Sequence, residues 1–140
     1  MSSIIVWTDG AARGNPGPAG AGAQLTTPEG EVVGEIAEGL GETTNNVAEY
    51  TAAIRGLERA AELGATDVVL RSDSQLLINQ LSGRYRVKSE HLIPLYRRLR
   101  ALARGFERIR FEHVPRERNT EADRLANEGV DAWLAGGAGG

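Results

Sequence analysis

The stretch "NNVAEYTAAIRGLERAAELGATDVVLRSD" (residues 45–73) joins an amphipathic helix to a buried strand, and this pair decides the fold class. At about 100° per residue, the apolar side chains of the helical part fall on one arc, with the small residues Ala53 and Gly56 near its centre. Gly64 ends the helix, and the run 66–73 is short enough to be a strand buried on both faces. A helix that leads into such a strand is typical of α/β proteins with a parallel sheet.

The flanking segments extend this pattern in both directions. We expect strands at 3–9 and 32–40, a turn-rich loop at 10–22 running into a Gly/Ala-rich strand to about 27, a helix from 45, a strand at 66–73, helices at 74–81 and 89–105, a strand at 106–114 and a helix at 119–134. Short connections make the first three strands antiparallel neighbours. The sequence therefore predicts an α/β fold with a mixed sheet covered on both faces, formed by residues 1–134 and followed by a flexible Gly-rich tail, 135–140.

Composition narrows the class of protein. A chain of 140 residues with 41% hydrophobic residues fits one domain with a real core. We see neither an apolar run long enough to cross a membrane nor a signal peptide, so we expect a cytoplasmic protein without a membrane partner. The absence of cysteine excludes disulfides, thiolate zinc sites and a cysteine nucleophile.

Charge is unevenly distributed along the chain. Residues 84–110 hold nine basic residues and two acids, whereas the rest of the chain carries a net charge of −10. The basic residues are Arg84, Arg86, Lys88, Arg97, Arg98, Arg100, Arg104, Arg108 and Arg110. A local basic stripe on an acidic body favours a nucleic-acid partner with a defined docking site. A solvated helix face is the commoner meaning of a charge run, and that interpretation stays open here.

Glu49 lies in the middle of the apolar arc of the helix that starts at 45. A lone carboxylate buried there would be costly, and it would neutralise rather than stay charged. The plainer alternative is that this first-turn glutamate caps the helix or leans into water.

Three more acids have similar positions. Asp9 and Asp73 end apolar strands, and ligands of parallel α/β sheets gather beyond the carboxyl ends of strands. Asp123 falls on the apolar arc of the last helix. Each has a plainer explanation: turn chemistry for Asp9, a helix cap for Asp73 and helix N-terminal preference for Asp123.

If all four acids point inward, their negative charges need a shared counter-charge. Two carboxylates about 4 Å apart repel by roughly 4 kcal/mol at an effective dielectric near 20. In a chain with no cysteine and two histidines, an oxygen-ligated hard cation is the natural counter-ion, and Mg²⁺ or Mn²⁺ fits.

Four segments together resemble the type 1 ribonuclease H family in its compact form, which lacks a long basic handle. They are "TDGAARGNPGPAGAGAQL" (8–25), "TTNNVAEYTAAIRGL" (43–57), "SDSQLLINQL" (72–81) and "RNTEADRLAN" (118–127). The resemblance covers essentially the whole chain in the family's order. It implies the ribonuclease H fold, a five-stranded mixed sheet with helices on both faces.

The resemblance also implies an activity. Asp9, Glu49, Asp73 and Asp123 match the family's catalytic, metal-binding acids. The implied reaction is hydrolysis of the RNA strand of an RNA–DNA hybrid, leaving 3′-hydroxyl and 5′-phosphate ends. Two Mg²⁺ ions, with Mn²⁺ as a substitute, would activate water and stabilise the leaving oxygen. We expect a monomer; double-stranded RNA stays open as a second partner.

Further residues match the family's substrate contacts. In the family, the Gly-rich loop and the Asn pair read the minor groove, one glutamine contacts a base edge, and a threonine helps to grip a DNA phosphate. The matching residues, with those of the basic segment, are Gly10, Ala11, Arg13, Asn15, Thr44, Asn45, Asn46, Gln75, Arg84, Arg86, Lys88 and Ser89. Minor-groove reading suits a hybrid, because its A-like minor groove displays 2′-hydroxyl groups.

The sequence departs from the family in two places. The loop before the last helix is only "PRERN" (115–119), without the mobile histidine of well-known bacterial members. Arg116, Glu117 or Arg118 substitutes for that histidine in product release, or the assistance is absent. The handle is reduced to 82–91 and has Ser89 where asparagine is common. A catalytically inactive hybrid-binding module and a related nuclease of the same fold remain the alternatives.

Overall fold

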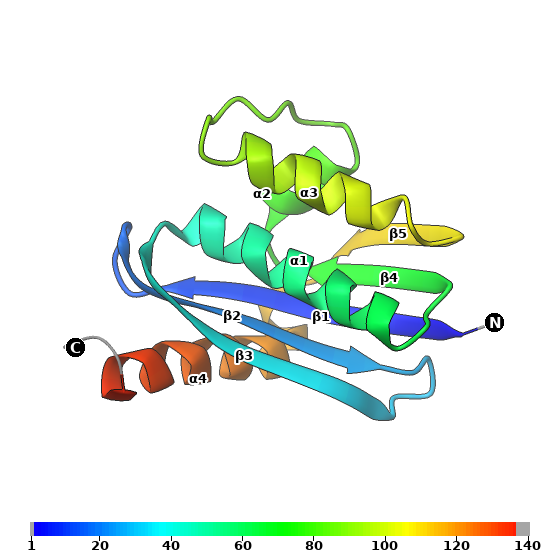
Figure 1. Ribbon diagram of the computed structural model, residues 1–140, viewed down its shortest axis with the longest axis horizontal. Helices are drawn as coiled ribbons and strands as arrows, with labels where there is room; N and C mark the ends of the chain where they lie inside the picture. The colour runs from blue at the N-terminus through cyan, green and yellow to red at the C-terminus, as the bar shows by residue number, and fades with distance from the viewer. Residues whose placement is uncertain (1, 137–140) are drawn as a thin grey trace.

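The computed structural model describes residues 2–136. The strands are β1 Ser3–Ala12, β2 Gly17–Thr26, β3 Val32–Thr43, β4 Asp67–Ser72 and β5 Arg108–His113. The helices are α1 Asn45–Glu62, α2 Gln75–Leu81, α3 Ile93–Ala103 and α4 Thr120–Gly136, with a short 3₁₀ helix η1 at Arg116–Arg118. Helices α1, α2 and α3 lie on one side of the sheet and α4 lies on the other (Figure 1).

The five strands form one mixed sheet in the order β3-β2-β1-β4-β5. β1 pairs with β2 and β2 with β3 in antiparallel fashion, whereas β1, β4 and β5 are parallel. The predicted α/β class, the five-stranded mixed sheet and the helices on both faces are therefore confirmed.

Helix α1 packs on β1 through its small residues. Ala53 and Ala60 are fully buried, and a Cβ added at Gly56 would lie 2.5 Å from Val6 Cγ1. The helix begins with Thr44, whose hydroxyl accepts a hydrogen bond from the Val47 backbone at 3.2 Å. This close packing places the first turns of α1 against β1, the strand that carries Asp9.

Helix α4 packs on the other face of the sheet through the glycines of β2. In "GPAGAGAQLT" (17–26), alanines and glycines alternate, so each type occupies one face. A Cβ added at Gly22 would lie 2.3 Å from the Ala126 nitrogen, and one at Gly20 would lie 2.2 Å from the Ala126 oxygen. The glycines therefore let the backbones of α4 and β2 approach directly.

The connection between β1 and β2 is shorter than the sequence predicts. The expected loop at 10–22 is wrong, since β1 continues to Ala12 and β2 starts at Gly17. The Arg13 backbone N–H donates to the Pro18 carbonyl at 2.8 Å and closes a tight hairpin. Most glycines of this stretch serve helix packing, which a turn-based interpretation misses.

Helix α3 starts later than expected, because the predicted helix 89–105 begins at Ile93. Pro94 lies in the first turn of α3, where its missing N–H has no helical partner to lose, whereas a helix that started at 89 would place Pro94 in its interior and break the helical hydrogen bonding. Residues 82–92 therefore form an irregular segment between α2 and α3 that carries Arg84, Arg86 and Lys88.

Other boundaries differ by small amounts. β3 extends to Thr43, β5 covers only Arg108–His113, and α4 continues to Gly136, two residues into the predicted tail. The remaining tail residues, 137–140, lie outside the described part of the chain. Among residues 2–136, no helix combines the length and hydropathy needed to span a bilayer.

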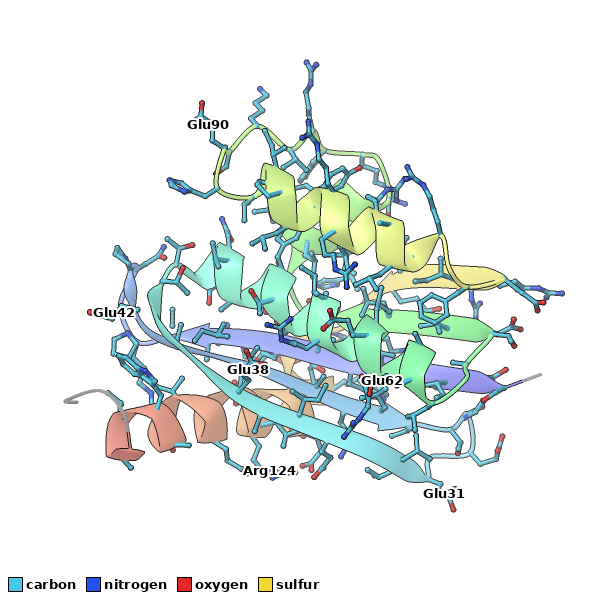
Figure 2. All side chains as sticks on the ribbon, viewed as in Figure 1. Glu31, Glu38, Glu42, Glu62, Glu90 and Arg124 are labelled. Atoms are coloured by element: carbon cyan, nitrogen blue, oxygen red, sulfur yellow. The ribbon has the colours of Figure 1, made fainter. Side chains whose placement is uncertain are left out.

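Acidic side chains gather on the β3 side of the molecule. Glu38 and Glu42 lie in β3 and Glu31 directly precedes it (Figure 2), and Glu42 also lines the hollow that Ser89 and His91 border at the start of α1.

Candidate active site

Asp9 and Asp73 are neighbours at the edge where β4 ends. The parallel pairing of β1 with β4 stops at Thr8 and Ser72, so the next residue of each strand is an acid. The expectation that Asp9 ends its strand is wrong, since β1 continues to Ala12 along β2. Asp9 instead lies on the part of β1 that β4 leaves uncovered.

Glu49 points into the fold and contacts the strand beside Asp9. Its side chain is 5% exposed, so the alternative that it leans into water is wrong. One carboxylate oxygen accepts a short hydrogen bond from the Gly10 backbone N–H. Only glycine fits at position 10, because an added Cβ would lie 2.3 Å from the Glu49 nitrogen.

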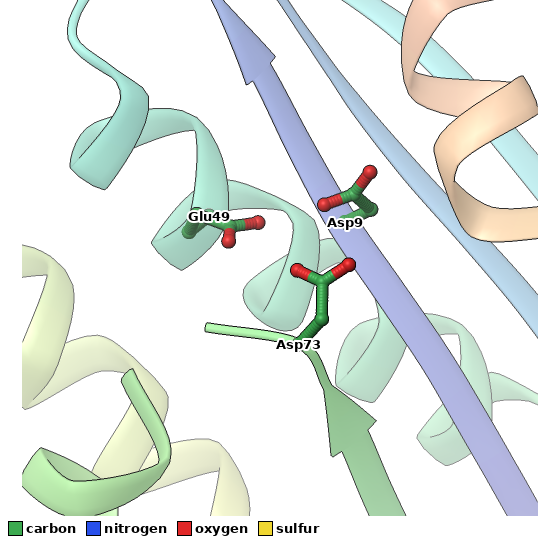
Figure 3. A group of neighbouring side chains, drawn as sticks. All are labelled: Asp9, Glu49 and Asp73. Carbon is green, nitrogen blue, oxygen red and sulfur yellow. The ribbon is translucent and has the colours of Figure 1, made fainter. Parts of the chain in front are cut away.

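The three carboxylates converge from three elements (Figure 3). One oxygen each of Asp9, Glu49 and Asp73 lies within 4.8 Å of the others. Burial, followed by the charges of Glu49 and Asp73, raises the pKa of Asp9 well above its usual range. Burial likewise raises the pKa of Glu49, although the Gly10 N–H opposes this effect.

A hard divalent cation fits this donor set. The three side chains offer only carboxylate oxygens, the ligands that Mg²⁺ and Mn²⁺ prefer. Without a cation, burial and mutual repulsion push Asp9 and Glu49 toward their protonated forms. A bound cation would supply the missing positive charge and favour the ionised carboxylates.

Asp123 lies beside the cluster, but it is not buried. The sequence places it on the inward arc of α4, and that prediction is wrong because its side chain is exposed in the first turn. It lies close enough to Asp9 to raise the pKa of that carboxyl. Asn127 donates to the Asp123 Oδ1 at 3.4 Å and holds it at the rim.

Asn119 is a site residue that the sequence analysis missed. It is 1% exposed, and its Nδ2 donates to the Thr8 carbonyl at 2.9 Å and lies 3.5 Å from Asp73 Oδ2. It therefore ties the start of α4 to the edge that carries Asp9 and Asp73. As the first residue of the helix expected at 119–134, it gave no sign of this position in the sequence.

The short loop after β5 brings a cation to the cluster. Arg116, Glu117 and Arg118 form η1, and all three are exposed. The charge of Arg116 lowers the pKa of Glu49, so this guanidinium lies within electrostatic reach of the carboxylates. The proposed auxiliary role of this loop stays a prediction.

Predicted substrate contacts line one hollow at the start of α1. The hollow, about 430 Å³, brings Asn15, Thr44, Asn46 and Ser89 together from three segments of the sequence, and the acid Glu42 also lines it. Asn15 Oδ1 accepts from the Asn45 backbone N–H at 3.0 Å, which fixes the hairpin against the helix. His91 also lines this hollow, and its place in a predicted helix gave no sign of it.

The remaining predicted substrate contacts lie at several separate places on the protein. Arg84 and Arg86 line a hollow of about 580 Å³ in the segment before α3, and Lys88 in the same segment is exposed. Gln75 faces a separate hollow at the β5 edge. Arg13 turns to α4 and pairs with Asp131 at 2.8 Å, so its side chain is engaged within the protein. Gly10 and Ala11 lie within β1 beside the cluster.

The raised carboxyl pKa values predict how the stability of the metal-free protein depends on pH. Ordinary carboxyls ionise near pH 4, whereas Asp9 and Glu49 stay protonated to higher pH in the folded state. Folding then takes up protons at these two groups, so their contribution to the free energy of unfolding is largest below about pH 4 and falls as pH rises above about 5. We expect Asp9→Asn to be more stable than the wild type by about 1–2 kcal/mol at pH 8 in EDTA. Melting temperatures at pH 5 to 8 test this, and parallel curves for the two proteins would contradict it.

Comparisons with known proteins agree with this arrangement. A family model described as reverse transcriptase-like matches residues 7–129. A bifunctional protein from Mycobacterium tuberculosis is 49% identical over 130 residues, which are 92% of this chain and 36% of that protein. The chain therefore spans about a third of the length of this relative. A ribonuclease H from Halorhodospira halophila is 38% identical over 94% of this chain and 95% of its own length.

A solved structure shows the same fold. LC11-RNase H1, isolated from compost by a metagenomic approach and solved in complex with an RNA/DNA hybrid, superposes with a TM-score of 0.89 at 42% identity. The match covers 94% of this chain and 99% of that one. Matches of this extent and identity, together with the compact segment between α2 and α3, lead to one conclusion: the chain belongs to the type 1 ribonuclease H family.

Proposed function

We propose that this protein hydrolyses the RNA strand of RNA–DNA hybrids with the help of two divalent metal ions, leaving 3′-hydroxyl and 5′-phosphate ends. The convergence of Asp9, Glu49 and Asp73 within 4.8 Å of one another carries the proposal. The cluster lies at the carboxyl edge of the parallel strands, where α/β proteins bind ligands. A hybrid-binding relative, LC11-RNase H1, supports the choice of substrate.

One group of residues would hold the metal ions, and another group would hold the substrate. Asp9, Glu49 and Asp73 would hold Mg²⁺, or Mn²⁺ in its place, with Asp123 joining from the rim. Bound ions would lower the pKa of an attacking water and stabilise the leaving oxygen. Gly10 positions the Glu49 carboxylate, and Asn119 positions the Asp73 carboxylate. The protein then needs no nucleophile of its own.

Substrate recognition would use the surfaces on either side of the cluster. The hollow formed by Asn15, Thr44 and Ser89 would hold a phosphate of the DNA strand. The basic segment with Arg86 and Lys88 would contact the same strand further along. A monomeric, cytoplasmic enzyme stays our prediction.

A panel of labelled duplexes tests the proposed function. We expect the protein to cut the RNA strand of a uniform RNA–DNA hybrid in Mg²⁺, to leave double-stranded DNA intact, and to stop in EDTA. Analysis of the product ends should give 5′-phosphate and 3′-hydroxyl groups. Tight hybrid binding without cutting would favour the inactive binding module. Preferred cutting of double-stranded RNA or of a junction would favour a related nuclease.

Arg116 should contribute to the rate. Burial raises the pKa of Glu49 and the charge of Arg116 opposes this rise, so the same guanidinium would also attract a phosphate held at the cluster. We expect Arg116→Ala to lower kcat about tenfold, equivalent to about 1.4 kcal/mol, because a cation near the developing charge is lost. Arg118→Ala removes the same charge from the same exposed turn and should change kcat less than about twofold. Equal losses in the two variants would assign the effect to the general charge of the loop.

A further inference from the structure

A polar hollow lies between α2 and β5, and the proposed function gives it no role as a unit, although Gln75 and Arg84 in its lining match substrate contacts of the family. Its volume is about 410 Å³. The polar side chains that line it are Gln75, Asn79, Ser82, Arg84 and His113, and its apolar lining includes Ile78 and Phe111.

The hollow opens beside the carboxylate cluster. His113 pairs with Ser72 in the parallel register of β5 and β4, and Ser72 directly precedes Asp73. Neighbouring strands lie about 4.8 Å apart, so His113 is close to the strand end that carries Asp73. Gln75 follows two residues later at the start of α2. A strand of nucleic acid that passes Asp73 would therefore reach this hollow within a short distance.

The lining has the chemistry of a phosphodiester site. Arg84 and His113 are exposed, and neither forms an ion pair within residues 2–136. No acid is among the residues that line the hollow in this part of the chain. The amides of Gln75 and Asn79 and the hydroxyl of Ser82 add hydrogen-bonding groups beside the guanidinium of Arg84. Such a mixture suits a sugar–phosphate backbone better than a free ion.

Arg84 is held in place by the turn that follows α2. Its backbone N–H donates to the Asn79 carbonyl at 2.8 Å, and the Tyr85 N–H donates to the same oxygen at 3.1 Å. Gly83 adopts a φ of +80°, a left-handed geometry that favours glycine and allows this turn. The base of the side chain is therefore fixed over the hollow before any ligand arrives, which lowers the entropy cost of binding.

We propose that this hollow binds a backbone phosphate of the RNA strand, next to the bond that is cut at Asp73. The inference rests on the proposed function and extends it to a second RNA contact. The RNA strand is the one that would meet Asp73, whereas the DNA phosphate has its predicted place in the hollow of Thr44 and Ser89 at the start of α1. Arg84 would supply the charge, with Gln75, Asn79 and His113 as hydrogen-bond donors.

A scan with neutral phosphates tests the contact. Binding would be measured with Asp9→Asn, which should bind hybrid without cutting it, on hybrids that carry one uncharged methylphosphonate at successive RNA or DNA positions. We expect one RNA position near the scissile bond to weaken binding about five- to tenfold. Adding Arg84→Ala and His113→Ala should weaken binding of the unmodified hybrid, abolish this sensitivity, and reduce the salt slope of log Kd by about 1.

Controls separate this contact from general charge and from folding. Arg104→Ala removes an exposed cation at the other end of α3 and should leave the sensitive position unchanged. His113→Gln keeps a polar side chain and serves as a milder second variant. The proposal is overturned if the methylphosphonate at the RNA position still weakens binding after Arg84 and His113 are replaced. It is also overturned if the two substitutions remove only the effect of a methylphosphonate at a DNA position.

The proposed function and this inference can fail separately. Wild-type protein that neither cuts nor binds the hybrid would refute both. Wild-type protein that cuts the hybrid, combined with a scan that the two substitutions leave unaltered, would overturn the role of the hollow alone.

Discussion

Replacing Asp9 with asparagine should lower the rate of hybrid cleavage by at least about a thousandfold and leave hybrid binding within about threefold of the wild type. Asparagine has nearly the same shape but lacks the charge that would hold a cation. Loss of metal-assisted charge stabilisation is worth several kcal/mol, and about 4 kcal/mol corresponds to a thousandfold. Single-turnover cleavage and fluorescence anisotropy with labelled hybrid give the two numbers.

The same substitution controls for damage to the fold. Asp9 sits among carboxylates that raise its pKa, so the neutral variant should melt at or above the wild-type temperature in EDTA. A variant that is stable but does not cleave would show that the loss of activity comes from the catalytic step and not from unfolding. Asp73→Asn should behave alike, and near-normal turnover in either variant would refute the metal assignment. Asp131→Asn changes an exposed acid on α4 and should keep full activity.

Replacing Gly22 with alanine should destabilise the protein by about 2–4 kcal/mol. The new Cβ would lie 2.3 Å from the Ala126 nitrogen and 2.4 Å from the Ala122 carbonyl oxygen. Both atoms belong to the α4 backbone, which cannot rotate away as a side chain would. Helix α4 would have to lift from the sheet, and we expect the melting temperature to fall by roughly 10 °C.

A second glycine of the same sheet provides the matched control. Gly34 in β3 has negative φ, and a Cβ there would meet only the Arg59 and Leu25 side chains, 3.6 Å away or more. Gly34→Ala should therefore change the free energy of unfolding by no more than about 0.5 kcal/mol. Equal destabilisation by the two substitutions would show that α4 does not depend on the close approach at Gly22.

The fold was predictable where hydrophobic periodicity and stop signals agree. The arc of small residues in 45–62 and Gly64 predict α1, and the apolar run before Asp73 predicts β4. The hairpin after β1 was not predictable in this way, because its glycines serve contacts with α1 and α4 that only the folded chain reveals. The start of α3 depends on Pro94, whose effect on the preceding residues a periodic pattern does not register.

Some residues of the site could be predicted from the sequence and others could not. Glu49 stood out because a charge on an apolar arc breaks a local rule, and the structure buries it against Gly10. Asn119 and His113 break no such rule: the first resembles a helix cap and the second an ordinary strand residue. Their places near Asp73 follow from strand pairing and from the short turn before α4, which are long-range features.

Cleavage of one hybrid with and without metal tests the central claim most directly. Wild-type protein would be mixed in EDTA with a hybrid labelled on its RNA strand, and Mg²⁺ would be added in excess after a set interval. The account predicts an intact RNA strand before the addition and rapid cutting after it, with no cutting of an all-DNA duplex. Cutting at full rate in EDTA, or no cutting after Mg²⁺ or Mn²⁺ despite hybrid binding, would contradict a metal-dependent catalytic centre at Asp9, Glu49 and Asp73.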